Sequence, residues 1–77
     1  MENNFLKTKD LYLAAFIYSQ QVELVKVGRE DRTCWFYFSN KLLCEELQTL
    51  YWSNKGNTAP KVFADAARSL KDLIFAT

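Results

Sequence analysis

Histidine is absent from this chain of 77 residues, and glycine and proline occur only twice and once. The chain therefore lacks the commonest general base near neutral pH and the commonest nitrogen ligand of metals. Its two cysteines, Cys34 and Cys44, do not make a complete zinc-ligand set by themselves. We expect no metal and no cofactor, and we expect both thiols to be buried and reduced. A disulfide between them stays open, because the sequence does not give their separation in space.

Catalytic combinations of residues are also lacking. The sequence has no Gly-rich phosphate loop, and neither cysteine has an identifiable partner that would lower its thiol pKa. Glu45 and Glu46 are adjacent, and adjacent side chains of a helix point about 100° apart instead of converging on one substrate. We therefore predict a protein that is not an enzyme.

Charge of one sign is lacking too, because ten Lys and Arg residues face nine Asp and Glu residues. The formal net charge of +1 is no overall signature of nucleic-acid or membrane binding, so any such activity needs a local patch. No apolar stretch approaches the roughly 20 residues of a membrane span, and residues 1–4 have no signal-peptide features. We expect a cytoplasmic protein that does not bind membranes.

Apolar and aromatic side chains, by contrast, are plentiful. Hydrophobic residues make up 49% of the chain and aromatic residues 16%, which argues against disorder. We expect residues 1–77 to form a single domain, with residues 1–7 as a polar N-terminal arm. A domain this small buries only about 60–65% of the surface of its unfolded chain, so self-association is a reasonable source of further stability.

The densest aromatic run lies at residues 33–39, and it is typical of a β-strand. The β-branched segment at residues 22–27 precedes it, separated by the charged residues 28–32, so the pattern predicts a hairpin. A two-residue turn at Glu30 and Asp31 would pair Val27 with Cys34 and Val25 with Phe36. A five-residue loop would instead shift this register by one residue.

The two-residue turn divides the hairpin into two faces, because successive strand side chains alternate. The predicted core face consists of Val25, Val27, Cys34, Phe36 and Phe38. The other face consists of Leu24, Lys26, Trp35 and Tyr37.

Helical patterns flank the hairpin. Residues 9–20 follow a capping residue at Thr8 and are apolar nearly all round, which predicts a helix buried on more than one side. A second helix begins after Ser39 or Asn40, and a third runs from Pro60 to about residue 75. The fold class is therefore α+β, with the order helix, antiparallel β-hairpin, helix, helix. The predicted core comprises Phe16, Val25, Val27, Phe36, Phe38, Leu47, Phe63, Leu70 and Ile74.

Three segments, residues 9–16, the aromatic run 34–38 and residues 63–74, resemble a known family. This family is a group of short bacterial and phage-associated proteins classified only as a domain of unknown function. The resemblance covers nearly the whole chain and implies a small stand-alone domain of bacteria or their mobile elements. The family has no assigned active site, so the resemblance implies no site residues.

The surplus of apolar surface favours a protein-interaction or assembly module, most simply a homodimer. We predict that the aromatic hairpin face, together with an off-stripe tryptophan, contacts the partner. The predicted interface residues are Leu24, Lys26, Trp35, Tyr37 and Trp52.

Nucleic-acid binding is the alternative. Arg29 and Arg32 flank the predicted turn, and aromatic rings beside Lys26 could stack on bases. The last helix adds further basic residues, although acidic residues interrupt both groups. The candidate contacts outside the hairpin face are Arg29, Arg32, Lys61, Arg68 and Lys71.

Overall fold

The computed structural model describes residues 4–76, which form three helices and one three-stranded antiparallel sheet of strand order β1-β3-β2. The predicted α+β class is confirmed, and so is the hairpin. Residues 1–3 of the predicted polar arm, which include most of the segment without signal-peptide features, lie outside the described residues. The elements are β1 (Leu6–Thr8), α1 (Leu11–Ser19), β2 (Leu24–Glu30), β3 (Thr33–Phe38), α2 (Lys41–Trp52) and α3 (Pro60–Ala76).

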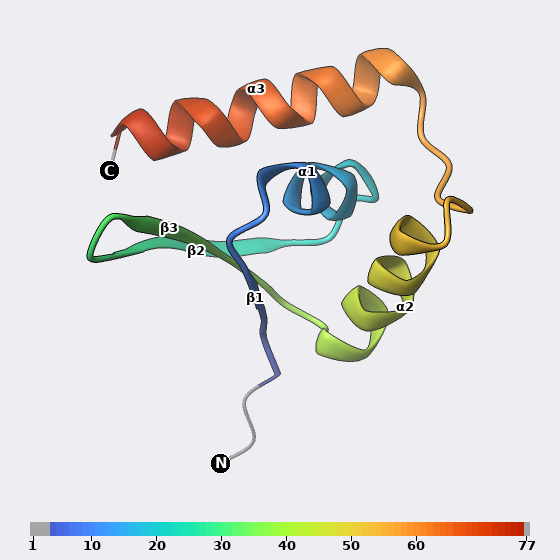
Figure 1. Ribbon diagram of the computed structural model, residues 1–77, viewed down its shortest axis with the longest axis horizontal. Helices are drawn as coiled ribbons and strands as arrows, with labels where there is room; N and C mark the ends of the chain where they lie inside the picture. The colour runs from blue at the N-terminus through green and yellow to red at the C-terminus, as the bar shows by residue number, and fades with distance from the viewer. Residues whose placement is uncertain (1–3, 77) are drawn as a thin grey trace.

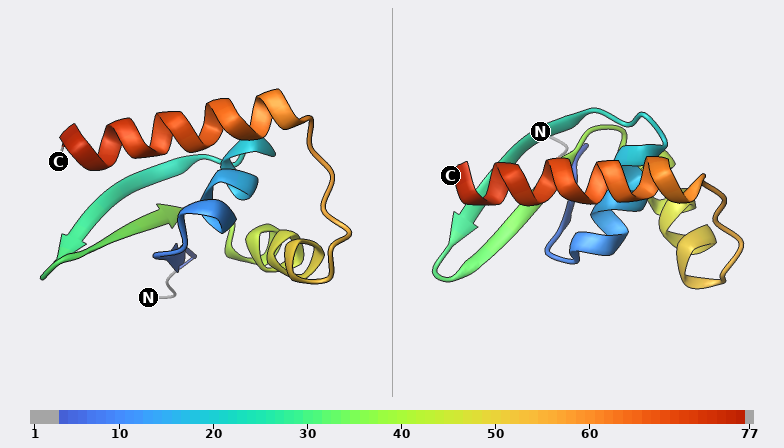
Figure 2. Two further views of the ribbon diagram at one scale, coloured as in Figure 1. Left: turned by 45° about the horizontal axis from the view of Figure 1, so that its top comes forward. Right: turned by 90° about the horizontal axis from the view of Figure 1, so that it is seen from above.

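All the helices lie toward one side or one end of the sheet. In Figure 1, α1 and α3 lie above the hairpin of β2 and β3, and α2 lies at the end away from the hairpin turn. Figure 2 shows α3 crossing α1 and continuing along the hairpin. None of the helices described between residues 4 and 76 is long and apolar enough to cross a membrane.

Strand β1 is the main element that the sequence reasoning missed. It lies in the predicted polar arm and pairs with β3, placing Leu6 opposite Phe38 and Thr8 opposite Phe36. Three residues are too few for an alternating pattern to stand out, since Leu6 is the only large apolar residue among them. The pairing makes β3 the central strand of the sheet.

Helix α1 begins two residues later than predicted, because Asp10 and not Thr8 is its cap. The Asp10 carboxylate accepts hydrogen bonds from the backbone N–H groups of Tyr12 and Leu13, which would otherwise lack helical partners. Thr8 acts one step earlier, since its hydroxyl oxygen accepts a bond from the N–H of Asp10. The prediction of burial on more than one side is confirmed, because residues 13–17 are all buried.

The second and third helices start where the sequence indicates. Asn40 caps α2 in the left-handed conformation, with φ of 61°, and its side chain accepts a bond from the N–H of Leu43. Pro60 is the first residue of α3, where a missing N–H costs little. After α2 the chain turns back toward the end of the helix, because the N–H groups of Lys55 and Gly56 both donate to the carbonyl of Leu50.

The predicted hairpin register is wrong by two residues. The turn is made by Asp31 and Arg32, so Glu30 pairs with Thr33 and Val27 pairs with Phe36. Asp31 has φ of 57°, a left-handed conformation that Asp tolerates better than most residues. A register shift of two residues leaves each side chain near the turn on its predicted face of the hairpin, because strand side chains alternate with a period of two.

A bulge changes the faces farther from the turn. The pairing shifts between Leu24 and Lys26, so that Leu24 lies opposite the buried Phe38. Val25 occupies the irregularity and is 40% exposed. The assignment of Val25 to the core was therefore wrong, and Leu24 packs against the core instead of sharing the face of Trp35.

The rest of the predicted core is confirmed. Phe16, Phe36, Phe38, Leu47 and Leu70 are buried, and the remaining predicted positions, Val27, Phe63 and Ile74, pack against them while partly exposed. The core also contains buried residues that the sequence reasoning did not include in its core set. These are Leu13, Ala14, Ala15, Ile17, Val22, Cys44 and Ala66.

Candidate functional site

One face of the sheet carries two aromatic rings and no helix among the described residues. The β3 side chains alternate, with Phe36 and Phe38 buried under the helices and Trp35 and Tyr37 partly exposed on the other side. We call the surface formed by Trp35, Tyr37 and their neighbours on β1 and β2 the open sheet face. Its two rings were expected to need cover from another molecule.

Lysine side chains provide part of that cover. The Nζ atom of Lys7, on β1, lies 4.6 Å from the ring centroid of Trp35 and 5.6 Å from that of Tyr37. Lys26, on β2, approaches the Tyr37 ring to 4.7 Å, and Lys9 approaches the Trp35 ring to 6.0 Å. These distances are within the range of cation–π attraction, so the open sheet face is both aromatic and basic.

Glu30 is the acid that contacts this cluster. Its Oε2 lies 3.2 Å from Nζ of Lys7, and it accepts a 3.5 Å hydrogen bond from the hydroxyl of Tyr37. The hydrogen bond to Glu30 raises the pKa of Lys7 above its ordinary value, so this lysine is charged at neutral pH. An exposed pair of this kind contributes little stability, but it orients the ammonium group over the rings.

The strands explain how these residues converge. The cross-strand partner of Tyr37 is Lys7 on β1 and Lys26 on β2, and directly opposed residues of an antiparallel sheet project from the same face. Gly28 lies opposite Trp35, and a Cβ there would lie 3.2 Å from Cε1 of Tyr37. Glycine thus leaves room for the Tyr37 ring beside β2.

The two arginines of the hairpin do not join the open sheet face as a group. Arg29 lies opposite Cys34 on the other face, and its Nη2 donates a 3.4 Å hydrogen bond to the carbonyl of Ile74 near the end of α3. A cation there complements the negative end of the helix dipole. Arg32 lies in the turn and is exposed.

The basic residues of α3 lie on another surface. Lys61, Arg68 and Lys71 are exposed on the helix that covers α1, on the opposite side of the sheet from Trp35. Lys61 forms a 3.2 Å ion pair with Asp65. The candidate nucleic-acid contacts of the sequence reasoning are therefore divided between the hairpin and α3.

The predicted interface residues are divided too. Lys26, Trp35 and Tyr37 lie together, whereas Leu24 faces the core. Trp52 is the last residue of α2, 61% exposed, with its ring 5.0 Å from that of Tyr51 in an edge-on arrangement. Figure 1 places α2 away from the hairpin turn, so Trp52 belongs to a separate surface.

Neither cysteine forms a disulfide in the structure. Cys44 is fully buried, and its thiol donates a 3.3 Å hydrogen bond to the carbonyl of Ser39. Burial raises the pKa of Cys44, with the neighbouring Glu45 adding to the effect, so the unreactive thiol predominates at neutral pH. Cys34 is only partly buried, in contrast to the expectation for both thiols.

The sequence reasoning missed Lys7 and Lys9 because it missed β1. The alternation from Leu6 to Lys9, with apolar or hydroxyl residues separated by lysines, is the signal that could have placed both ammonium groups on one face. Its short length made it indistinguishable from a polar arm. The long-range pairing with β3 is what brings these lysines to the rings.

Comparisons with known proteins assign a family and no activity. No curated protein and no solved structure matches the chain. One family model, described as a domain of unknown function, matches residues 3–76, almost the whole chain. The protein therefore belongs to the DUF5659 family of domains of unknown function.

Proposed function

We propose that the protein is a non-enzymatic binding module whose open sheet face binds single-stranded nucleic acid. The observation that supports this proposal is that the ammonium groups of Lys7, Lys9 and Lys26 each lie within 6.0 Å of the ring centroid of Trp35 or Tyr37. Single-stranded nucleic acids are recognised by this combination, because bases stack on rings and phosphates pair with cations. The net charge of the whole chain does not argue for it, so the proposal depends on local geometry.

Charge favours an anionic partner over a second copy on this face. Among the described residues, three lysines and one contacting acid, Glu30, leave the cluster positive. Two copies related by a two-fold axis would place lysines near lysines, and like charges across an interface are unfavourable. A polyanion would instead neutralise the lysines and release counterions.

The lysines would exchange one partner for another on binding. A cation–π contact at an exposed site is worth only about 0.5–1 kcal/mol, whereas a base stacked on an aromatic side chain contributes about 1–3 kcal/mol. Lys7 and Lys26 have flexible side chains, so each can leave its ring and pair with a phosphate while a base occupies the ring. Trp35 and Tyr37 lie at adjacent positions of the same face, as successive stacked bases require.

The test is a fluorescence anisotropy titration of a labelled oligothymidylate at low salt. We expect Trp35→Ala to weaken binding by about 1–3 kcal/mol while leaving the far-UV circular dichroism of the fold unchanged. Lys7→Gln and Lys26→Gln should each lower the slope of log affinity against log salt by about 0.7. In a Trp52→Phe background, quenching of the remaining Trp35 fluorescence should follow the binding curve.

Lys61→Gln is the matched control, because it removes one lysine from the distant surface of α3. Its affinity and salt slope should equal those of the wild type. Equal losses from Lys61→Gln and Lys7→Gln would show only diffuse electrostatic attraction. Absence of binding to single and double strands at low salt would refute the proposal.

Self-association is a second candidate function, and it would involve exposed side chains of the helices instead of the open sheet face. Leu42 on α2 is 76% exposed and Phe75 on α3 is 86% exposed, so both side chains have apolar surface that a contact with another chain would remove from water. Trp52 adds a large exposed ring. We therefore move the proposed dimer contact from the hairpin face to the helices.

A further inference from the structure

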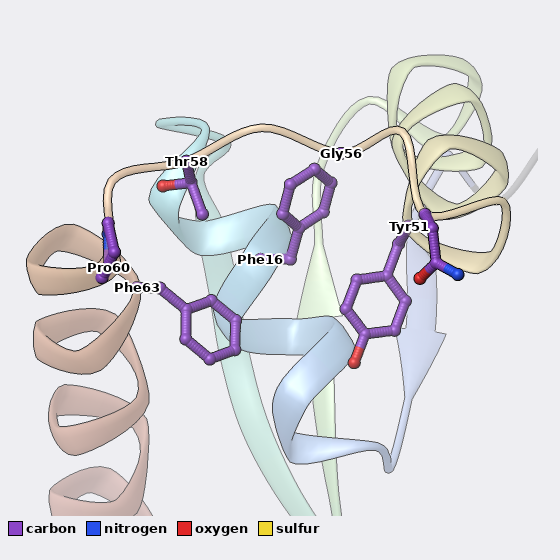
Figure 3. A pocket seen from close by; sticks show the side chains of 7 residues that line it. Phe16, Tyr51, Gly56, Thr58, Pro60 and Phe63 are labelled. Atoms are coloured by element: carbon purple, nitrogen blue, oxygen red, sulfur yellow. The ribbon is translucent and has the colours of Figure 1, made fainter.

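A pocket of about 350 Å³ lies on the helical side of the molecule, apart from the open sheet face (Figure 3). Phe16 from α1, Tyr51 from the end of α2, and Phe63 from the first turn of α3 supply its rings. The connection between α2 and α3 lines another side of it. The other lining residues are Asn54, Gly56, Thr58 and Pro60.

The pocket has a defined shape because the connection is held over it. Asn54 adopts a left-handed conformation with φ of 61°, and the N–H of Gly56 donates to the carbonyl of Leu50. At the far end, Nε2 of Gln20 donates a 3.2 Å hydrogen bond to the carbonyl of Asn57. Gly56 itself passes so close to Phe16 that a Cβ would lie 2.7 Å from its ring, so no side chain from this residue fills the space.

The lining chemistry selects the class of ligand. The lining residues carry no charge, so an ion would lose hydration without gaining a counter-charge. Phe16, Tyr51 and Phe63 give the lining flat aromatic surface, which an aromatic ligand can contact edge-on or offset. Asn54 and Thr58 add a small number of neutral hydrogen-bonding groups to the lining.

The volume selects a small molecule. Pockets for small ligands usually measure about 300–1,000 Å³, and this one lies at the low end of that range. A protein partner would need a contact of about 800 Å² on this side, far more than a single pocket provides. We propose that the pocket is a binding site for a small, uncharged, planar aromatic compound of about the size of indole.

The probe is indole itself, titrated into isotope-labelled protein and followed by NMR. We expect saturable shifts of Gly56, Thr58 and the ring of Phe63, and we expect no such shifts with benzoate, whose charge the pocket does not match. Phe63→Ala should weaken indole binding by at least about tenfold, as truncation of an aromatic anchor usually does. The exposed neighbour Val62→Ala is the control and should bind as the wild type does.

A second variant keeps the test decisive if Phe63→Ala fails to fold. Thr58→Phe leaves the core residues in place and should abolish binding by filling the pocket. Shifts scattered over other surfaces, equal binding of benzoate, or unchanged binding in Thr58→Phe would each overturn the proposal. Saturable binding of an aromatic peptide but not of indole would also overturn it, in favour of a peptide anchor. None of these outcomes depends on nucleic-acid binding by the open sheet face.

Discussion

Single residues decide how closely the α2–α3 connection approaches the core. Gly56 lies against the ring of Phe16, which is only 3% exposed and has little room to move. Phe16 is thus covered by backbone on the side where a larger residue would displace it. The turn chemistry around Asn54 indicates a loop, but only the contact with Phe16 explains why this loop requires a glycine.

We expect Gly56→Ala to lower the free energy of unfolding by about 1–3 kcal/mol, the usual cost of overpacking. Urea denaturation measures this change. Gly28→Ala is the control, because its Cβ would lie 3.2 Å from a Tyr37 ring on the open sheet face, where the ring can shift outward. Similar losses in both variants would contradict the argument from close approach.

The phenol of Tyr51 should make the stability of the protein depend on pH. Burial raises the pKa of its phenol above the ordinary value of 10.0, and the negative charge of Asp10 and the neighbouring Tyr12 add to the shift. A folded-state pKa above the unfolded one gives stability that is complete below the unfolded value and lost as pH rises through the folded value. The protein should therefore lose stability in the alkaline range above pH 10.

Urea unfolding of the wild type and of Tyr51→Phe, followed from about pH 8 to about pH 11, checks this expectation. The difference in stability between the two proteins should change with pH only in the upper part of that range. Tyr18→Phe removes a different phenol and serves as the control. A constant difference between wild type and Tyr51→Phe would show that the phenol does not contribute.

At the scale of elements, the β2 strand shows how an edge is kept from pairing. The strand order leaves β2 at one edge of the sheet. The bulge near Val25 interrupts its ladder, and Lys26, Arg29 and Glu30 place charges along it. Bulges and edge charges both discourage strands of other molecules from adding to a sheet, so the edge is a poor site for self-association.

Because of the bulge, we expect substitutions at Phe36 and Val25 to change the free energy of unfolding by different amounts. Phe36→Ala should cost about 3–5 kcal/mol, because it empties a position that is 1% exposed in the central strand. Val25→Ala should change the free energy of unfolding by less than about 0.5 kcal/mol, because the side chain lies at the exposed irregularity. Denaturant unfolding of both variants compares them. A large loss from Val25→Ala would support a register in which Val25 opposes Phe36.

At the scale of the whole molecule, the distribution of surface chemistry separates two kinds of contact. The open sheet face joins rings to cations, whereas most of the exposed large apolar side chains of the helices belong to α2 and α3. The sequence reasoning placed the partner contact on the hairpin face and Trp52, because it could not place Lys7 and Lys9 over the rings.

Sedimentation velocity at micromolar concentration tests whether the helices associate. We expect a reversible dimer in the wild type and a shift toward monomer in Leu42→Ser and Phe75→Ser, because both remove highly exposed apolar groups. Val25→Ser removes an apolar group from the edge strand and should leave the dimer intact. A monomer at every concentration would contradict this prediction.

Much of the fold was predictable because it depends on local patterns. The hairpin, the cap at Asn40, the start of α3 at Pro60 and the stripe of α3 follow from alternation, capping chemistry and helical periodicity. The candidate site was predictable only in part. Lys26, Trp35 and Tyr37 emerged from one hairpin, whereas Lys7 and Lys9 depended on a short strand that gains its order from pairing with β3.

The sequence by itself determined that Trp35 and Tyr37 face away from Phe36 and Phe38, because side chains of a strand alternate whatever the strand pairs with. Only the tertiary structure decided what lies over those rings, because Lys7 and Lys26 reach Tyr37 from two different strands. It likewise decided the bulge that exposes Val25 and the pocket that gathers three rings from three helices. Such features depend on the register and separation of distant segments, which local periodicity does not specify.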